Sequence, residues 1–278
     1  MKAIIDIDIY TLMIAFSITI IPLAGLLYYR VPLLKDAMIG LVRMSLQLSL
    51  VAVYLEYVFK LNSPWLNSLW VIIMILISIY TTIKRMRLQF RLFIIPFLIS
   101  GLTSVIIIDL FFLGYVIKLD YLFDARYFIP ISGMVLGNAM NHNIVGLTSY
   151  FGGLTTNREL YYFLLTNNNS KTLAIAPFIR DALHKGLNPL VATMTVMGLI
   201  SLPGMMTGQI LGGSSPSTAI KYQIMIMLAI FTGVSINLIL SIFFSNRFIF
   251  DSYDRLSKNI FHPKNNNKKN KQKITARN

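Results

Sequence analysis

The sequence predicts an all-α, polytopic membrane protein with about seven transmembrane helices and a cytoplasmic helix-turn-helix between two of them. Of its 278 residues, 55% are hydrophobic and 13% are charged, a balance that is typical of membrane proteins rather than of soluble ones. The apolar residues are gathered into long runs, and a helix needs about 20 of them to cross a bilayer. Lys and Arg are concentrated in alternate connections, which gives the chain an orientation.

Seven apolar stretches are expected to span the membrane. They are, approximately, residues 9–28, 36–59, 66–83, 92–116, 128–149, 190–211 and 219–245. The first follows two acidic residues and no clear cleavage site, so we expect it to be retained and not removed as a signal peptide. The fifth is the weakest, because three asparagines and a histidine between residues 138 and 143 dilute its apolar character.

The basic residues of the connections orient these spans. One side carries 19 Lys and Arg residues and the other carries five, while Arg43 lies within a span. The side richer in Lys and Arg faces the cytoplasm. We therefore expect a multi-pass protein of the cell membrane with its N-terminus outside and its C-terminus in the cytoplasm.

Two regions are expected along the chain. Residues 1–262 form a transmembrane domain, and residues 263–278 form a disordered basic tail, because this Lys/Asn-rich segment has no apolar periodicity. Nine of the 25 basic residues lie from Arg247 onward. A cationic segment beside a membrane commonly faces anionic lipid, so lipid is an expected partner and nucleic acid is not.

The most irregular apolar stretch lies at the sixth span. Residues 194–223 read MTVMGLISLPGMMTGQILGGSSPSTAIKYQ, without a charge before Lys221. Pro203 and Gly204 interrupt it, because proline removes a backbone donor and clashes with the preceding turn. A helix broken at membrane depth is tolerated only where protein or a water-filled path satisfies the freed groups. A kinked helix that merely packs fits the pattern equally well.

Several kinds of chemistry have no motif in the sequence. The chain has no cysteine, and therefore no disulfide and no thiolate site. Its three histidines are scattered, and neither a zinc-type helix motif nor a Walker phosphate loop is present. We expect no catalytic residue and no cofactor in this chain. The identity of any metal ligands stays open: methionine thioethers are soft donors, although filling between helices explains them at least as well.

The longest internal connection, about residues 150–189, is expected to fold as two helices. The first is Arg158–Thr166, followed by a turn of three asparagines. A serine then caps a second helix that runs to about Lys185, where Gly186 and Pro189 are expected to stop it. The pattern fits a docking element for a cytoplasmic partner, and it also fits an amphipathic linker on the membrane surface.

Five segments resemble one known family. They are IPISGMVLGNAM (residues 129–140), VMGLISLPGMMTGQILGG (196–213), AIKYQIM (219–225), VRMSLQL around Arg43 and Gln47, and PFIRDAL around Arg180 and Asp181. On these segments the chain is similar to the FetB family of ABC permeases, which includes YbbM-type proteins and plant permeases tied to aluminium tolerance. The likeness runs from the second span to the seventh.

The resemblance implies a permease subunit, itself not an enzyme, that forms a homodimer and pairs with a separate cytoplasmic ATPase, on which ATP binds. It implies export of iron or another metal cation. It also implies that the long connection is a degenerate EAA coupling loop with Asn168 at the position of the loop's glycine. The residues expected to act in coupling are Arg158, Asn168, Arg180 and Asp181. A transporter of a different small solute and a non-transporting scaffold or stress-response protein remain as alternatives.

A translocation path is expected between the second, fifth and sixth spans, close to the break. The residues assigned to it are Arg43, Gln47, Met134, Asn138, Met140, Pro203, Gly204, Met205 and Met206. Arg43 and Gln47 lie four residues apart and share a helix face, and the methionines offer weak contacts from which a metal can be released. Helix packing alone is the competing explanation. Two acids, Glu56 and Asp109, are expected in contact with water near the outer ends of their spans.

Overall fold

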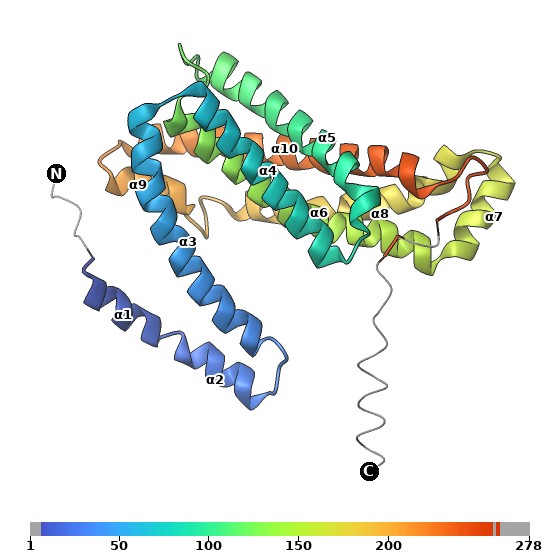
Figure 1. Ribbon diagram of the computed structural model, residues 1–278, viewed down its shortest axis with the longest axis horizontal. Helices are drawn as coiled ribbons and strands as arrows, with labels where there is room; N and C mark the ends of the chain where they lie inside the picture. Colours follow the sequence, from blue (N-terminus) through green and yellow to red (C-terminus); the bar gives the residue numbers. More distant parts are fainter. Residues whose placement is uncertain (1–6, 258–259, 262–278) are drawn as a thin grey trace.

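The computed structural model describes residues 7–257 and 260–261, and throughout these residues the regular secondary structure is helical (Figure 1). The segments are α1 (Ile9–Ser17), α2 (Ile20–Tyr28), α3 (Leu34–Leu61), α4 (Pro64–Met86), α5 (Phe90–Asp109), the π-helix η1 (Leu110–Val116), α6 (Ala125–Thr156), α7 (Arg158–Asn168), α8 (Lys171–Val196), α9 (Gly204–Leu211) and α10 (Pro216–Ile249). The all-α prediction is confirmed for this part of the chain. The basic tail expected at residues 263–278 lies outside the described residues.

The first three helices form a hairpin that stands apart from the rest of the molecule (Figure 1). α1 and α2 divide one apolar run, because Pro22 cannot donate the bond to the Ile18 carbonyl that would continue the helix. No residue of α1 or α2 is buried, and in α3 Val58 alone is buried. Near its C-terminus α3 meets α4, where the rings of Tyr54 and Trp70 stack with centroids 4.1 Å apart. The hairpin therefore exposes apolar surface that suits lipid or another protein chain.

The remaining long helices, α4, α5, α6, α8 and α10, pack into one body in which α6 and α10 are the central pair. Glycines bring helices close together at two places. A Cβ on Gly233 of α10 would lie 2.5 Å from the Val135 side chain of α6. A Cβ on Gly186 of α8 would lie 3.2 Å from the Cα of Gly146 on α6. Small residues allow such close approach between membrane helices.

Helix α8 is longer than the sequence predicts. The expectation that Gly186 and Pro189 end it near Lys185 is wrong, since the helix continues to Val196. Gly186 is buried against α6 and the Leu238 side chain, so it serves packing rather than termination. Pro189 is exposed, and the carbonyl that loses its helical donor one turn earlier can therefore be satisfied from outside the protein.

Five helical segments of the described chain are long and apolar enough to cross a membrane, namely residues 9–28, 34–61, 64–86, 90–116 and 216–249. The long helices α6 and α8, of 32 and 26 residues, fall outside this set. Helix α6 is largely covered by neighbouring helices, because it contacts α4, α5, α8 and α10, whereas more than half of the residues of α8 are exposed. Polar residues of membrane helices face the protein interior, so hydropathy is a weaker signal for inner helices than for those that face lipid.

The connections predicted to follow the third and fifth spans lie at one end of the body, together with the segment after α10. The Gln89 N–H donates to the Ile260 carbonyl over 3.1 Å, and Arg158 donates to the Leu256 carbonyl over 2.5 Å. Figure 1 shows α7 at this end and α9 at the opposite end. We call the end that carries α7 the basic end, because the connection that holds Lys84, Arg85, Arg87 and Arg91 lies there together with Arg158 and Lys171.

Candidate functional site

The chain leaves helical geometry between α8 and α9, at the irregular stretch that the sequence singled out. Gly198 has a left-handed φ of 84°, and its N–H donates to the Ser201 carbonyl over 3.0 Å. The N–H groups of the next two residues share the Val196 carbonyl, at 3.2 and 3.1 Å. Pro203 then occupies the N-cap of α9, which starts at Gly204. The turn thus needs a glycine where φ is positive and satisfies several of the backbone groups that the break frees.

A methionine-rich cavity of about 420 Å³ lies beside this break. Met194, Met197 and Met206 line it from the chain around the break, and Met227 lines it from α10. Nε2 of Gln223 lies 3.9 Å from the Met197 sulfur, and its Oε1 is buried without a hydrogen-bond partner among the described residues. Four thioethers and one free amide oxygen are donors that suit a soft cation or a polarizable solute. We call this the methionine cavity.

The residues that the sequence assigned to a path divide around this cavity. Pro203 and Met206 line it. Met205 packs against the core instead, and Gly204 is exposed with nothing within 4 Å of a Cβ built on it. Met227 and its α10 neighbours were not expected here. The sequence feature that could have identified them is the four-residue spacing from Gln223 to Met227, which places both residues on one helix face.

Arg43 and Gln47 do not reach the methionine cavity within a single chain. Both are exposed on the part of α3 that stands away from the body (Figure 1). Glu56 is also exposed on this helix. An arginine at membrane depth needs water or a polar partner. Among the described residues, none forms an ion pair with Arg43.

Met134, Asn138 and Met140 of α6 lie in other surroundings. Asn138 Nδ2 donates to the Met134 carbonyl over 2.8 Å, a bond within the helix. Met140 lines a small gap of about 20 Å³ beside Asn143 and Asn237. The structure therefore does not gather these three residues with the break at Pro203-Gly204.

The polar network beside this gap joins three helices. Asn143 Nδ2 of α6 donates to Asn237 Oδ1 of α10 over 2.6 Å, and Asn237 Nδ2 donates to Ser104 Oγ of α5 over 2.9 Å. Asn143 Oδ1 has no partner among the described residues, and the gap has room for one water molecule. The network is a helix-to-helix contact, as amides between membrane helices commonly are.

Asp109 is a buried acid that the sequence analysis expected in water, and this expectation is wrong. The residue is 6% exposed. Ser132 Oγ donates to its Oδ2 over 2.7 Å, while Oδ1 has no partner among the described residues. The signal was present in the sequence: Asp109 stands seven residues inside the end of the predicted span at Val116, or about 10 Å at 1.5 Å per residue. An acid at such a depth is a functional candidate by default.

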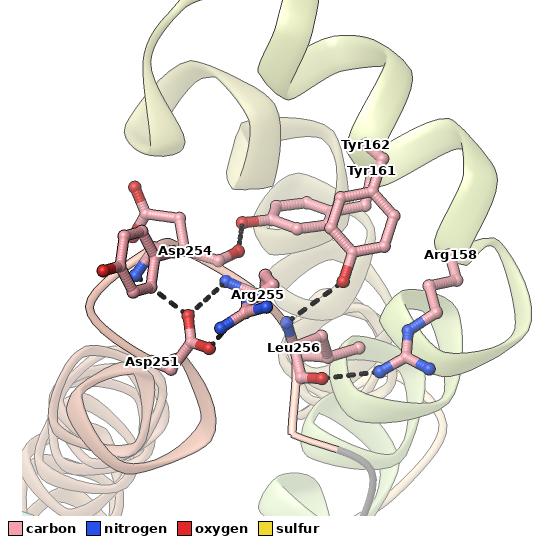
Figure 2. A network of polar contacts seen from close by, with 8 residues as sticks. Arg158, Tyr161, Tyr162, Asp251, Asp254, Arg255 and Leu256 are labelled. Carbon is pink, nitrogen blue, oxygen red and sulfur yellow. Dashed lines mark hydrogen bonds and ion pairs between the residues drawn. The ribbon is translucent and has the colours of Figure 1, made fainter.

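A second polar network, shown in Figure 2, ties α7 to the segment after α10 at the basic end. Arg158 donates to the Leu256 carbonyl, and the Tyr161 hydroxyl donates to the Asp254 carbonyl over 2.8 Å. Burial and the Asp254 carboxylate raise the pKa of Tyr161, which keeps its hydroxyl protonated as a donor. Lys171 at the start of α8 pairs with the Asp254 carboxylate at 2.9 Å. The segment after α10 is thus bonded both to α7 and to the start of α8.

The turn between α7 and α8 differs in detail from the sequence prediction. Asn168 is the last residue of α7, and the left-handed residue of the turn is Asn169, with a φ of 46°. Asn168 Nδ2 donates to the Leu164 carbonyl over 3.0 Å instead. A glycine-like conformation therefore exists in this turn, one residue later than expected, and asparagine tolerates it.

The two remaining residues expected to act in coupling lie on α8. Arg180 is exposed. Asp181 accepts hydrogen bonds from Lys185 Nζ over 2.7 Å and from the Ser149 hydroxyl of α6, and these bonds lower its pKa. Asp181 therefore links α8 to α6, while Arg180 is free to meet another molecule.

Within the described residues, no group of three or more His, Asp or Glu side chains could hold a metal ion. The donors that the structure does bring together are the thioethers and the amide of the methionine cavity. A metal that met this chain there would have soft, weakly held ligands.

Comparison with known sequences confirms the resemblance predicted from the sequence. The Uncharacterised protein family UPF0014 matches residues 9–250. UPF0014 membrane protein YjkA of Bacillus subtilis (strain 168) is 26% identical over 225 residues, which cover 81% of this chain and 88% of that protein. The "Probable iron export permease protein FetB" of Escherichia coli (strain K12) is 29% identical over 247 residues, 87% of this chain and 93% of that protein.

A plant protein is also similar. The protein ALUMINUM SENSITIVE 3 of Arabidopsis thaliana is 33% identical over 220 residues, 77% of each chain. No solved structure matches the chain. The family match spans every helix of the structure and agrees with its apolar, helical character. The chain therefore belongs to the UPF0014 family of membrane proteins.

Proposed function

We propose that this chain is the permease subunit of an ABC transporter, energised by a separate cytoplasmic ATPase subunit, and that it exports iron or another metal cation. The name of the Escherichia coli relative supports the permease role and the substrate class. In this proposal ATP binds and is hydrolysed on the partner subunit, and this chain carries neither a catalytic residue nor a cofactor.

The observation that carries the proposal is an exposed apolar face at the basic end. Leu160 and Phe163 lie three residues apart on α7 and therefore on one side of the helix, and their side chains are 46% and 63% exposed. Leu173, near the start of α8, is 57% exposed. The network of Figure 2 holds the helix that presents this face in place. Apolar side chains grouped outside the bilayer mark a protein interaction site, and we assign this face, with Arg180 beside it on α8, to the ATPase.

The topology that goes with this proposal has seven spans. The five apolar segments are joined by α6 as the fifth span and by α8 with α9 as the sixth. At 1.5 Å per residue, the 32 residues of α6 measure about 48 Å, so its last turns extend beyond a hydrocarbon core of about 30 Å. The basic end then faces the cytoplasm. A cysteine at Ser215 should react with a reagent added outside the cell, and one at Tyr253 only after permeabilisation.

The methionine cavity is the part of the path that the structure supports best. It lies beside the irregular backbone between α8 and α9, at the end of the body opposite α7 (Figure 1). Irregular backbone at membrane depth is tolerated where it lines a cavity. Thioethers hold a metal weakly enough to release it. A homodimer would supply a second α1–α3 hairpin and cover the exposed apolar surface of the first, and in it Arg43 and Gln47 would gain partners.

Co-purification tests the ATPase face. Phe163→Asp should abolish recovery of the ATPase with the tagged permease and the stimulation of its hydrolysis, because a carboxylate replaces an apolar contact. Leu61→Asp is the matched control. Leu61 is a similarly exposed apolar residue (67%), and it is the last residue of α3, outside the proposed ATPase face. Normal association of the Phe163 variant, or equal loss in both variants, would refute the assignment.

The alternatives predict other results. A carrier of a different small solute would keep the ATPase but give no change in cellular metal content when Met206 is altered. A non-transporting scaffold or stress-response protein would not stimulate hydrolysis by an ATPase, even with the intact chain.

A further inference from the structure

A second cavity of about 300 Å³ lies between α4, α5, η1 and the start of α6, and Asp109 is part of its wall. It shares no residue with the methionine cavity. Apart from Asp109 and the hydroxyl of Ser68, its lining is hydrocarbon, contributed by Val, Ile, Leu and Phe side chains. We call it the Asp109 cavity. Its size is at the lower end of the range for small-molecule sites, about 300–1,000 Å³.

The carboxylate in this wall is incompletely satisfied. Asp109 is 94% buried, and Oδ2 accepts from Ser132 Oγ over 2.7 Å. Oδ1 is buried and has no hydrogen-bond partner among the described residues. No Lys, Arg or His lines the cavity. A buried carboxylate without a counter-charge is strongly unfavourable, so the geometry requires a positive charge from outside the chain or a proton.

The backbone beside Asp109 is also unusual. Helix α5 ends at Asp109 and continues without a break as the π-helix η1, which starts at Leu110. The Ile117 N–H accordingly bonds to the Phe112 carbonyl five residues earlier, over 2.9 Å. π-helical turns are rare and occur frequently at functional sites. The π-helix lies in the wall of the cavity through Leu110 and Leu113.

The remaining walls indicate what kind of cation fits. Phe123 and Phe128 both line the cavity, with ring centroids 5.4 Å apart in an edge-to-face arrangement. Aromatic faces attract ammonium cations, and carboxylate with aromatic walls is the way in which quaternary ammonium groups are recognised. A hard metal ion needs about six or more oxygen ligands, whereas this cavity offers a carboxylate and a hydroxyl.

Access is from the membrane side. Ile72 of α4 and Ile106 and Leu110 of the α5–η1 segment line the cavity and are themselves 44%, 53% and 58% exposed. Both helices belong to segments that are long and apolar enough to cross a membrane, so we expect their exposed surface to face lipid. A ligand with an apolar body would therefore reach the cavity from the bilayer rather than from the basic end.

From these observations we propose that the Asp109 cavity binds a lipophilic ammonium-type monocation, with its charge against Asp109 Oδ1 and its apolar body between the aliphatic and aromatic walls. A proton alone would also neutralise the carboxylate, but it would leave the apolar cavity without an occupant. The proposal is independent of the ATPase partner and of metal export, and its test needs neither.

Two isosteric probes test it on the purified full chain in detergent. Benzyltrimethylammonium carries the charge, and neopentylbenzene has the same shape with carbon in place of nitrogen. The charged probe should bind saturably and at least about tenfold more tightly than the neutral one, a difference that corresponds to about 1.4 kcal/mol. Binding should be measured by calorimetry and by the rise in melting temperature that ligand binding produces.

The variants locate the site. Asp109→Asn keeps the shape of the side chain and should remove the preference for the charged probe. Asp120→Asn is the matched control, because Asp120 is exposed in the connection after η1 and does not line the cavity; it should retain the full preference. A wild-type chain that binds both probes equally or binds neither would overturn the proposal. So would an Asp109→Asn protein that keeps the preference, or a wild type whose stability follows pH while neither probe binds, since a proton is then the occupant.

Discussion

Substituting Gly186 by alanine tests the packing of α8 on α6, because close packing predicts a loss of stability and an open position predicts a gain. At an open position of a helix, Gly→Ala is favourable by about 0.5–1 kcal/mol, because alanine loses less conformational entropy on folding. At Gly186 the added Cβ would lie 2.7 Å from Leu238 Cδ2, 3.2 Å from the Gly146 Cα and 3.4 Å from the His142 carbonyl oxygen. The Leu238 side chain can rotate, but the Gly146 Cα is a backbone atom in tight contact, so the helices must separate by a few tenths of an ångström.

The expected net effect follows from these opposing terms. Overpacking costs about 1–3 kcal/mol, which exceeds the helix-propensity gain and leaves a net destabilisation of about 1–2 kcal/mol. For a chain of this size this corresponds to a fall in melting temperature of roughly 2–8 °C. The assay is apparent melting in detergent at a fixed heating rate, because membrane proteins often unfold irreversibly and the value then depends on the rate.

Gly152→Ala is the control for the Gly186 variant. Gly152 is also within a helix, α6, and nothing lies within 4 Å of a Cβ built on it, so its alanine variant should be as stable as the wild type or slightly more so. If Gly186→Ala behaves like Gly152→Ala, α6 and α8 do not approach as closely as the structure has them, and the reasoning fails.

Three further predictions concern other parts of the molecule. Asn237→Leu should destabilise the protein by about 1–3 kcal/mol, because Asn143 and Ser104 lose their buried partner. In the same melting assay the double Asn143→Leu/Asn237→Leu variant should recover part of this loss. A greater loss in the double variant than in Asn237→Leu would contradict the network. Met206→Leu conserves volume and should lower the free energy of unfolding by less than about 1.5 kcal/mol, yet it should lower the metal tolerance of cells. Met205→Leu is the control, because Met205 lies outside the methionine cavity, and it should leave metal tolerance unchanged. Equal tolerance in both variants would make the methionines packing residues. The pKa of Asp181 is lowered, so its bonds stabilise the fold above the usual carboxyl pKa of about 4, and this stabilisation is lost as the pH falls through the lowered pKa. On acidification the wild type should therefore lose more stability than Asp181→Asn. Parallel profiles of stability against pH for the two proteins would count against the contact.

The sequence predicted those features that depend on neighbouring residues. Apolar runs of sufficient length located the five helical segments that are long and apolar enough to cross a membrane, and the Pro203-Gly204 pair located the break between α8 and α9. The two helices of the long connection were expected because their capping and turn residues are adjacent in the chain. Each of these signals lies within about one helix length, so no knowledge of tertiary contacts was needed.

The features that the sequence missed depend on residues far apart in the chain. Gly186 reads as a helix stop until Gly146 and Leu238 are seen against it. The depth of Asp109 within its span could be read from the sequence, but its burial by Ser132 and the surrounding apolar wall could not. Arg43 and Gln47 share a helix face as predicted, but the direction in which α3 leaves the body decides what that face meets, and local pattern does not contain this direction.

The continuity of α8 connects the two parts of the proposed function. One helix runs from Lys171, beside the exposed apolar face of α7, to Met194 in the wall of the methionine cavity. Had the helix ended near Lys185, a flexible joint would lie between the ATPase face and the cavity. At 1.5 Å per residue its 26 residues span about 39 Å, so a single helix, with Pro177 and Pro189 inside it, reaches from the basic end to the methionine cavity. The close contact of Gly186 with Gly146 lies between these ends and joins α8 to α6 there.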